Sequence, residues 1–157
     1  MANVGKNISG RRKSTFVAGS LLLGALPLLT ACGSKKLPVY SVTGEVRFQG
    51  KPALGAEVIF HPQGGSEQQK QTRPNGRADE FGKFALTTYE SSDGAPAGEY
   101  QITITWPGPL PGADPKDMKA ALAGPDRLQG RYADPAKSGF KATVANSANQ
   151  LPVIELK

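Results

Sequence analysis

Two residue types with reactive side chains occur once each in this sequence of 157 residues: Cys32 is its one cysteine and His61 its one histidine. A thiol is a strong nucleophile that can be acylated, and a single cysteine has no internal disulfide to form. The thiol could also bridge to another chain or be buried as a small apolar side chain. Its position directly after an apolar run and the small residues Thr30 and Ala31 favours an attachment point instead.

The residues before Cys32 follow the pattern of a secretory signal. An apolar run from 15 to 29 comes after four basic residues: Lys6, Arg11, Arg12 and Lys13. A charged region, a short apolar region and small residues are typical of a signal peptide. A membrane-spanning helix needs about 20 apolar residues, whereas Gly24 and Pro27 interrupt a shorter run here. We predict that residues 1–31 are a signal peptide.

The residues Leu29, Thr30, Ala31 and Cys32 resemble a lipobox, the signal at which bacterial lipoproteins are cleaved and acylated. The resemblance covers residues 1 to about 34 and implies a diacylglyceryl group on the sulfur and usually a third acyl chain on the new N-terminus. Each buried methylene contributes about 0.8 kcal/mol, and two chains suffice for stable anchoring. Gly33 and Ser34 follow, without the aspartate that retains lipoproteins in the inner membrane. The resemblance therefore implies a lipid-anchored protein of the cell envelope and favours the outer membrane.

The part of the chain that follows the predicted signal peptide is long enough for one domain. Removal of residues 1–31 leaves 126 residues, enough for a single modest core. Four of the 19 basic residues and none of the 13 acidic ones lie in that segment, so the remainder has 15 basic and 13 acidic residues. No basic stripe with interleaved aromatic residues occurs, and we expect no nucleic-acid partner. We predict a lipidated linker, residues 32–39, and a domain, residues 40–157.

His61 lacks the sequence partners that enzymes need. A zinc site of the carboxypeptidase type needs at least two histidines and a carboxylate, and no Gly-x-Ser-x-Gly elbow accompanies His61 as it would in a serine hydrolase. Two acidic groups, Asp79 with Glu80 and Glu90 with Asp93, lack the spacing of a calcium-binding EF-hand. We expect turn carboxylates there, a solvent-edge histidine at 61, and no catalytic residue, metal or cofactor.

Alternating apolar and polar residues predict strands along the rest of the chain. The clearest is 98–106, where four apolar residues share one face: Tyr100, Ile102, Ile104 and Trp106. Similar patterns occur at 40–48, at 56–61, around Phe84 and Leu86, at 140–144 and at 151–156. Pro152 restricts the last strand to an edge or a start position.

Polar loops at 62–76 and 91–96 and a long excursion at 107–139 separate these strands. Within the excursion, Asp114 and Pro115 are typical of a helix start and Gly124-Pro125 of a helix end, with Met118, Ala121 and Leu122 on one face. About seven strands with turn clusters between them predict an all-β fold. We expect an antiparallel seven-stranded β-sandwich with one short helix in the long insertion.

Four strings of turn glycines and strand residues follow one another in 40–106: Val42-Thr43-Gly44-Glu45-Val46; Gly50-Lys51-Pro52 with Gly55-Ala56-Glu57-Val58-Ile59-Phe60; Gly82-Lys83-Phe84; and Pro96-Ala97-Gly98-Glu99-Tyr100. In this order they resemble the carboxypeptidase regulatory-like domain. The C-terminal third is similar only in its strand pattern, and the 107–139 excursion departs from the commonest form. The resemblance implies an immunoglobulin- or transthyretin-like (prealbumin-type) sandwich in an envelope setting, without catalytic residues.

Together these features predict a membrane-anchored, non-enzymatic module that acts as a structural or protein-interaction domain at the cell envelope. Its edge strands and the 107–139 excursion would make the contacts. The alternative is an envelope carbohydrate-binding module, for which Phe81, Tyr89 and Trp106 would have to form an exposed platform. The place of Trp106 in the strand alternation favours core filling instead. An enzyme would require His61 to be buried beside a carboxylate and a nucleophile.

Overall fold

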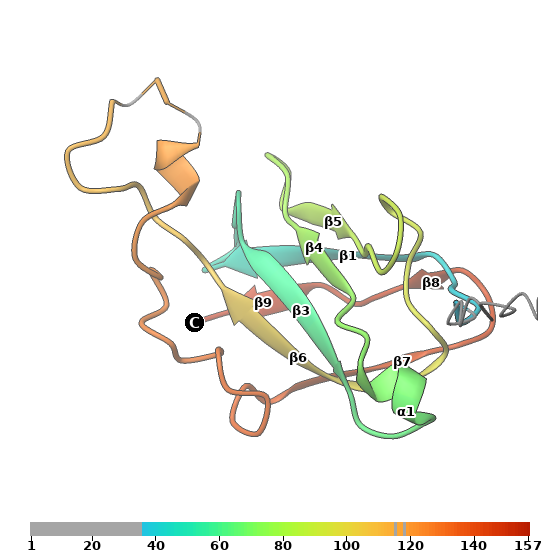
Figure 1. Cartoon of the computed structure of the whole chain (residues 1–157). Coiled ribbons are helices and arrows are strands. Elements are labelled where there is room, and N and C mark those ends of the chain that lie inside the picture. The colour runs from blue at the N-terminus through green and yellow to red at the C-terminus, as the bar shows by residue number, and fades with distance from the viewer. Residues whose placement is uncertain (1–35, 115, 118) are drawn as a thin grey trace, which may run out of the picture. The chain divides into compact units, whose positions relative to one another are not determined.

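The computed structural model describes residues 36–157 except 115 and 118. In this part of the chain two β-sheets enclose one apolar core, which confirms the predicted all-β sandwich (Figure 1). The residues of the predicted lipobox, Leu29, Thr30, Ala31 and Cys32, lie outside the described residues, as do Pro115 and Met118 of the predicted helix.

The first sheet is built around β1 (Val42–Phe48). The strands β2 (Lys51–Pro52) and β5 (Lys83–Ala85) pair with it antiparallel, and β8 (Asn149–Gln150) and β9 (Ile154–Leu156) pair with it parallel. Its side chains Val42 and Val46 point into the core with 1% and 0% exposure. Strands from both ends of the chain therefore meet on β1.

The second sheet has the order β4-β3-β6-β7. It comprises β3 (Glu57–Pro62), β4 (Asn75–Arg77), β6 (Gly98–Thr105) and β7 (Phe140–Val144). Tyr100, Ile102 and Ile104 of β6 are all buried, as their alternation predicts. The Tyr100 ring lies 5.4 Å from that of Phe60 on β3, so aromatic packing joins the two central strands inside the core.

Several short elements differ from the sequence prediction. The described residues contain nine strands rather than seven, because two-residue strands such as β2 and β8 are too short to show a period of two. The predicted loop 62–76 contains a helical turn, α1 (Glu67–Lys70), which Ser66 caps by accepting a hydrogen bond from the Gln69 N–H. The sheets are also not wholly antiparallel, because the chain crosses from β7 in one sheet to β8 in the other and then runs parallel to β1.

The 107–139 excursion projects from the end of β6 and contains a single turn of 3-10 helix, η1 (Ala120–Leu122), within its described residues (Figure 1). The predicted helix from Asp114 is shorter because the two arms of the excursion bind each other: Leu110 N–H donates to Ala120 O at 2.8 Å and Gly124 N–H to Gly108 O at 2.8 Å. The carboxylate nearest η1 is that of Asp117, which accepts from two backbone N–H groups, those of Lys119 and Ala120.

Asp126 fixes the base of the excursion to the sheet. Its carboxylate accepts from the N–H groups of Trp106 at 2.8 Å, Leu128 at 3.0 Å and Gly130 at 2.9 Å. Burial disfavours the charged form, but these backbone donors outweigh it and lower the pKa of Asp126. The excursion is therefore anchored by a charge at the point where β6 ends.

Gly94 allows the start of the first sheet to close. Tyr40 and Ala95 exchange two backbone hydrogen bonds of 2.9 and 3.0 Å just before β1. Gly94 has φ of +98°, and a Cβ at this position would overlap the carbonyl oxygen of Tyr40. Both the positive φ and the close approach require glycine here.

We expect Gly94→Ala to destabilise the domain by about 1–3 kcal/mol more than Gly50→Ala. Gly50 has a similar φ of +76°, but a Cβ at that position would meet no atom within 4 Å. Gly50→Ala therefore measures the free-energy cost of the positive φ alone, without the cost of a steric overlap. Urea denaturation followed by the fluorescence of Trp106 measures both. Equal losses in the two variants would contradict the close approach at Tyr40.

Candidate functional site

Strand β7 has one edge at which the described part of the chain places no neighbouring strand. The N–H and C=O groups of a strand residue point to the same side and alternate along the chain. On β6, the Ile104 N–H donates to Tyr132 O on the β7 side, and Glu99 O accepts from Gln63 N–H on the β3 side. The even-numbered residues of β6 therefore face β7.

The pairing register between β6 and β7 shows which backbone groups of β7 face β6. Gly98, Tyr100 and Ile102 lie opposite Val144, Ala142 and Phe140, so these three residues of β7 face β6. The backbone N–H and C=O groups of Lys141 and Thr143 then point away from the sheet. No strand among the described residues pairs with them.

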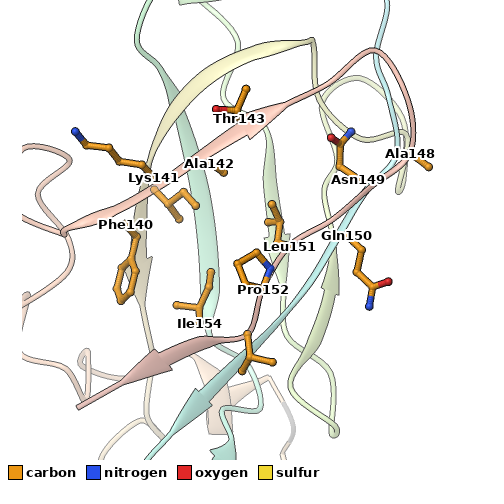
Figure 2. Close-up of a pocket in the computed structure, with 12 residues that line it drawn as sticks. Phe140, Lys141, Ala142, Thr143, Ala148, Asn149, Gln150, Leu151, Pro152 and Ile154 are labelled. Carbon is orange, nitrogen blue, oxygen red and sulfur yellow. The ribbon is translucent and has the colours of Figure 1, made fainter.

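A groove of about 570 Å³ runs beside this open edge (Figure 2). One wall is β7 and the other is the segment 148–154, which joins the opposite sheet. Figure 2 shows the Phe140 and Ile154 side chains on opposite walls, with Pro152 on the same wall as Ile154. The apolar lining residues are Ile102, Phe140, Ala142, Leu151, Pro152, Val153 and Ile154.

Polar and aromatic contacts fix the residues at both ends of β7. Asn149 Oδ1 accepts from the Ala145 N–H at 2.8 Å, and Asn149 Nδ2 donates to Ala145 O at 3.2 Å, which fixes the turn between β7 and β8. Phe140 packs against Tyr132 with ring centroids 5.4 Å apart. Val153 remains 47% exposed on the far wall. The groove is thus a built feature of the sandwich with apolar surface accessible from outside.

The other sheet edges are short or obstructed. Asn75 of β4 exchanges backbone hydrogen bonds of 3.0 and 2.7 Å with Thr87, which closes that edge. On the wall opposite β7, Pro152 has no N–H to donate. The strands β2 and β5 have only two and three residues. Among the described strands, β7 is therefore the one best able to accept an additional strand.

His61 is half-buried on the outer face of the second sheet instead of lying free at a solvent edge. Its Nε2 lies 2.8 Å from Thr103 Oγ1, and Thr103 is only 5% exposed. The nearest carboxylate on the same face of β3, that of Glu57, pairs with Arg77. The histidine therefore has a hydroxyl partner, but that hydroxyl is buried and the Glu57 carboxylate is bound to Arg77.

The carboxylates of Asp79 and Asp93 accept hydrogen bonds within turns of the backbone, as the sequence predicts. Asp93 accepts from three backbone N–H groups, those of Thr88, Tyr89 and Glu90, and Asp79 Oδ1 accepts from two, those of Phe81 and Lys83. Within the residues that the structure describes, no group of three or more His, Cys, Asp or Glu side chains could hold a metal ion.

The aromatic residues that a sugar platform would need do not lie together. The Arg127 guanidinium lies 4.7 Å above the ring of Trp106, whose Nε1–H donates to Leu54 O at 2.8 Å. Trp106 also packs against the core beside Phe48, so core filling describes it better than an exposed face. Phe81 is 62% exposed in its own turn.

No family model matches the chain, and no curated protein matches it. In the described part, no helix has the length and apolar character needed to cross a membrane. The groove and the partners of His61 were not predicted from the sequence. The alternation in 140–144 and Pro152 were visible signals, but neither shows that these two segments face each other.

We expect the titration of His61 to affect stability. Burial, and then the positive charge of Arg73, lower the pKa of His61 below its ordinary 6.5. The unfolded chain therefore binds more protons in the window just below pH 6.5, so the free energy of unfolding is fully present above that pH and falls as the pH drops through the folded pKa. His61→Gln should reduce the loss of stability between about pH 8 and about pH 5.

Urea denaturation of both proteins at the two pH values measures this difference. Asp93 and Asp126 also have lowered pKa values, but these lie below 3.8 and outside the window. An equal loss of stability in the wild type and the His61→Gln variant would contradict the assignment.

Proposed function

We propose that this chain is a lipid-anchored protein of the cell envelope whose β-sandwich is a non-enzymatic protein-interaction module. The observation that carries the proposal is the open edge of β7 beside an apolar groove. Edge strands with unpaired backbone groups are templates for pairing with another chain. The carboxypeptidase regulatory-like resemblance and the outer-membrane location belong to the same proposal.

An extended segment of a partner would bind as an added strand. Lys141 and Thr143 each offer one backbone donor and one acceptor, and a typical hydrogen bond contributes about 1 kcal/mol net. Alternate side chains of the added strand would enter the groove and contact Phe140, Leu151 and Val153. Backbone pairing would supply affinity, and the shape of the groove would supply specificity.

The start of the domain supports a short tether. Lys36 Nζ pairs with Glu90 at 3.2 Å and lies 5.5 Å from the centroid of the Tyr89 ring, and the Leu37 N–H donates to Tyr89 Oη at 3.2 Å. Lys36, four residues after Cys32 and inside the predicted linker 32–39, is thus already in contact with the domain. At most about 3.6 Å per residue separates the acylated sulfur from this point, roughly 14 Å in all. A partner would therefore have to reach the sandwich close to the membrane.

A glycan partner is the alternative that the sequence left open. It has less support, because Arg127 covers one face of Trp106, and Phe81 and Tyr89 lie in separate turns. We therefore propose a protein partner.

For the anchor, we expect the protein expressed in a lipoprotein-competent bacterium to begin at Cys32 with added acyl mass and to partition with membranes. Cys32→Ser removes the nucleophile and should lose the acyl mass. Intact mass and membrane fractionation measure both. If both proteins keep residues 1–31 and stay in the membrane, the lipobox interpretation is wrong and that segment is the anchor itself.

For the groove, we expect Val153→Asp to weaken partner capture by about tenfold, because burial of a valine contributes about 1.5–3 kcal/mol. A photo-crosslinking residue at Thr143 reports capture in intact cells. Leu54→Asp is the matched control, since Leu54 is 43% exposed and Val153 47%, and Leu54 lies outside the groove. Equal capture in the two variants would contradict binding at β7, and an adduct of twice the chain mass would identify the partner as a second copy.

A further inference from the structure

A second concave surface lies on the outer face of the same sheet, at its other edge. The register places Glu57 opposite Arg77 and Ile59 opposite Asn75, so the next pair along the strands is His61 with Arg73. These side chains and Gly76 line a hollow of about 480 Å³. Cross-strand neighbours on one face have Cβ atoms about 4.5–5.5 Å apart, so the imidazole and the guanidinium are close neighbours.

Arg73 is held in place without a neutralising carboxylate. Its Nη1 donates to Lys70 O and to Thr72 O, both at 2.7 Å. Among the described residues no carboxylate lies within 4.0 Å of its guanidinium, whereas Arg77 in the same hollow is paired with Glu57. Two backbone carbonyls thus fix the side chain through one nitrogen and leave its full positive charge uncompensated.

His61 is fixed in a complementary way. Its Nε2 is bonded to Thr103 Oγ1, so Nδ1 is the ring nitrogen that remains for a ligand. When the Thr103 hydroxyl donates to Nε2, the neutral imidazole carries its proton on Nδ1 and can donate it. The hollow then offers an arginine and a histidine donor, both already oriented by backbone or side-chain bonds.

We propose that this hollow binds an oxyanion group, a carboxylate or a phosphoryl group carried by a small molecule or a polymer, between Arg73 and His61. Both donors suit such a group, because guanidinium and imidazole form charge-assisted hydrogen bonds to planar or tetrahedral oxyanions. The site lies on β3 and at the β4 edge, and β6 separates it from β7, so it is separate from the proposed strand-binding groove.

Because of the charges around His61, a change in the pKa of its imidazole would reveal a bound anion. Arg73 lies opposite it, the Glu57–Arg77 pair lies further along the strands, and Lys141 lies beyond Gln101 in the same cross-strand row. The carboxylate of Glu99 lies on the same face of β6, two residues from Gln101, and partly offsets these positive charges. The Lys70–Glu67 pair of α1 is the remaining charged pair on the segment that leads to Arg73. A bound anion adds negative charge to this mainly positive setting and stabilises the imidazolium, so it raises the pKa of His61. By linkage, the anion binds more tightly as the pH falls.

The test uses the full chain in detergent micelles, without a histidine tag and with labelled histidine. Because the chain has one histidine, the imidazole gives one NMR signal set. Acetate, glucuronate and inorganic phosphate are titrated at constant ionic strength, with chloride as the replaced ion. We expect a saturable shift of the signal and a His61 pKa about one unit higher with a bound carboxylate, equivalent to about tenfold tighter binding to the protonated form.

Arg73→Gln should abolish the saturable shift, and Arg47→Gln is the control. Arg47 carries the same charge but pairs with Glu45 in the first sheet, so its loss leaves the hollow intact. Saturation by the carboxylate probes, by phosphate or by both identifies the source of the oxyanion. A shift that does not saturate, or that is equal in the two arginine variants, overturns the proposal. Neither result depends on lipidation or on a strand bound at β7.

Discussion

Parallel pairing of the C-terminal strands with β1 is the constraint on which the rest of the structure depends. β1 is the first long strand and carries two fully buried valines, Val42 and Val46, so both of its edges must be paired to satisfy its backbone. β8 and β9 provide that pairing on one edge. The chain can reach them only by leaving the second sheet after β7, and the two strands that follow each other in sequence therefore diverge into different sheets. The groove is the space between them.

The long strands could be predicted because their periods are clear. Tyr100, Ile102 and Ile104 alternate over enough residues for burial to overcome any local preference, and all three lie in the core. β8 has two residues and no period. The turn α1 has a local sequence signal, because Ser66 followed three residues later by Gln69 is a capping-box pattern. In the excursion, two aspartates compete as helix caps, and hydrogen bonds between its arms decide the outcome.

The groove at β7 and the hollow at His61 were harder to predict, because each depends on how strands distant in the sequence pair with one another. His61 and Arg73 are separated by an 11-residue segment with no apolar period, and only the pairing of β3 with β4 brings them together. The same is true of Phe140 and Ile154, which face each other across two sheets. Local patterns reveal which residues are apolar or charged, whereas long-range pairing decides which of them share a surface. The lipobox resemblance differs, since it depends on four consecutive residues and on no fold.

The two proposed binding surfaces would interfere little with each other if both were occupied. The row His61, Gln101 and Lys141 runs directly across the sheet from the hollow to the β7 edge. Two strand spacings of about 4.8 Å separate its ends, roughly 10 Å. This exceeds the screening length of about 8 Å at physiological ionic strength. Two unit charges at that distance in water interact by about 0.4 kcal/mol before screening. A strand added at β7 and an anion held at Arg73 would thus act as nearly independent ligands of one sheet.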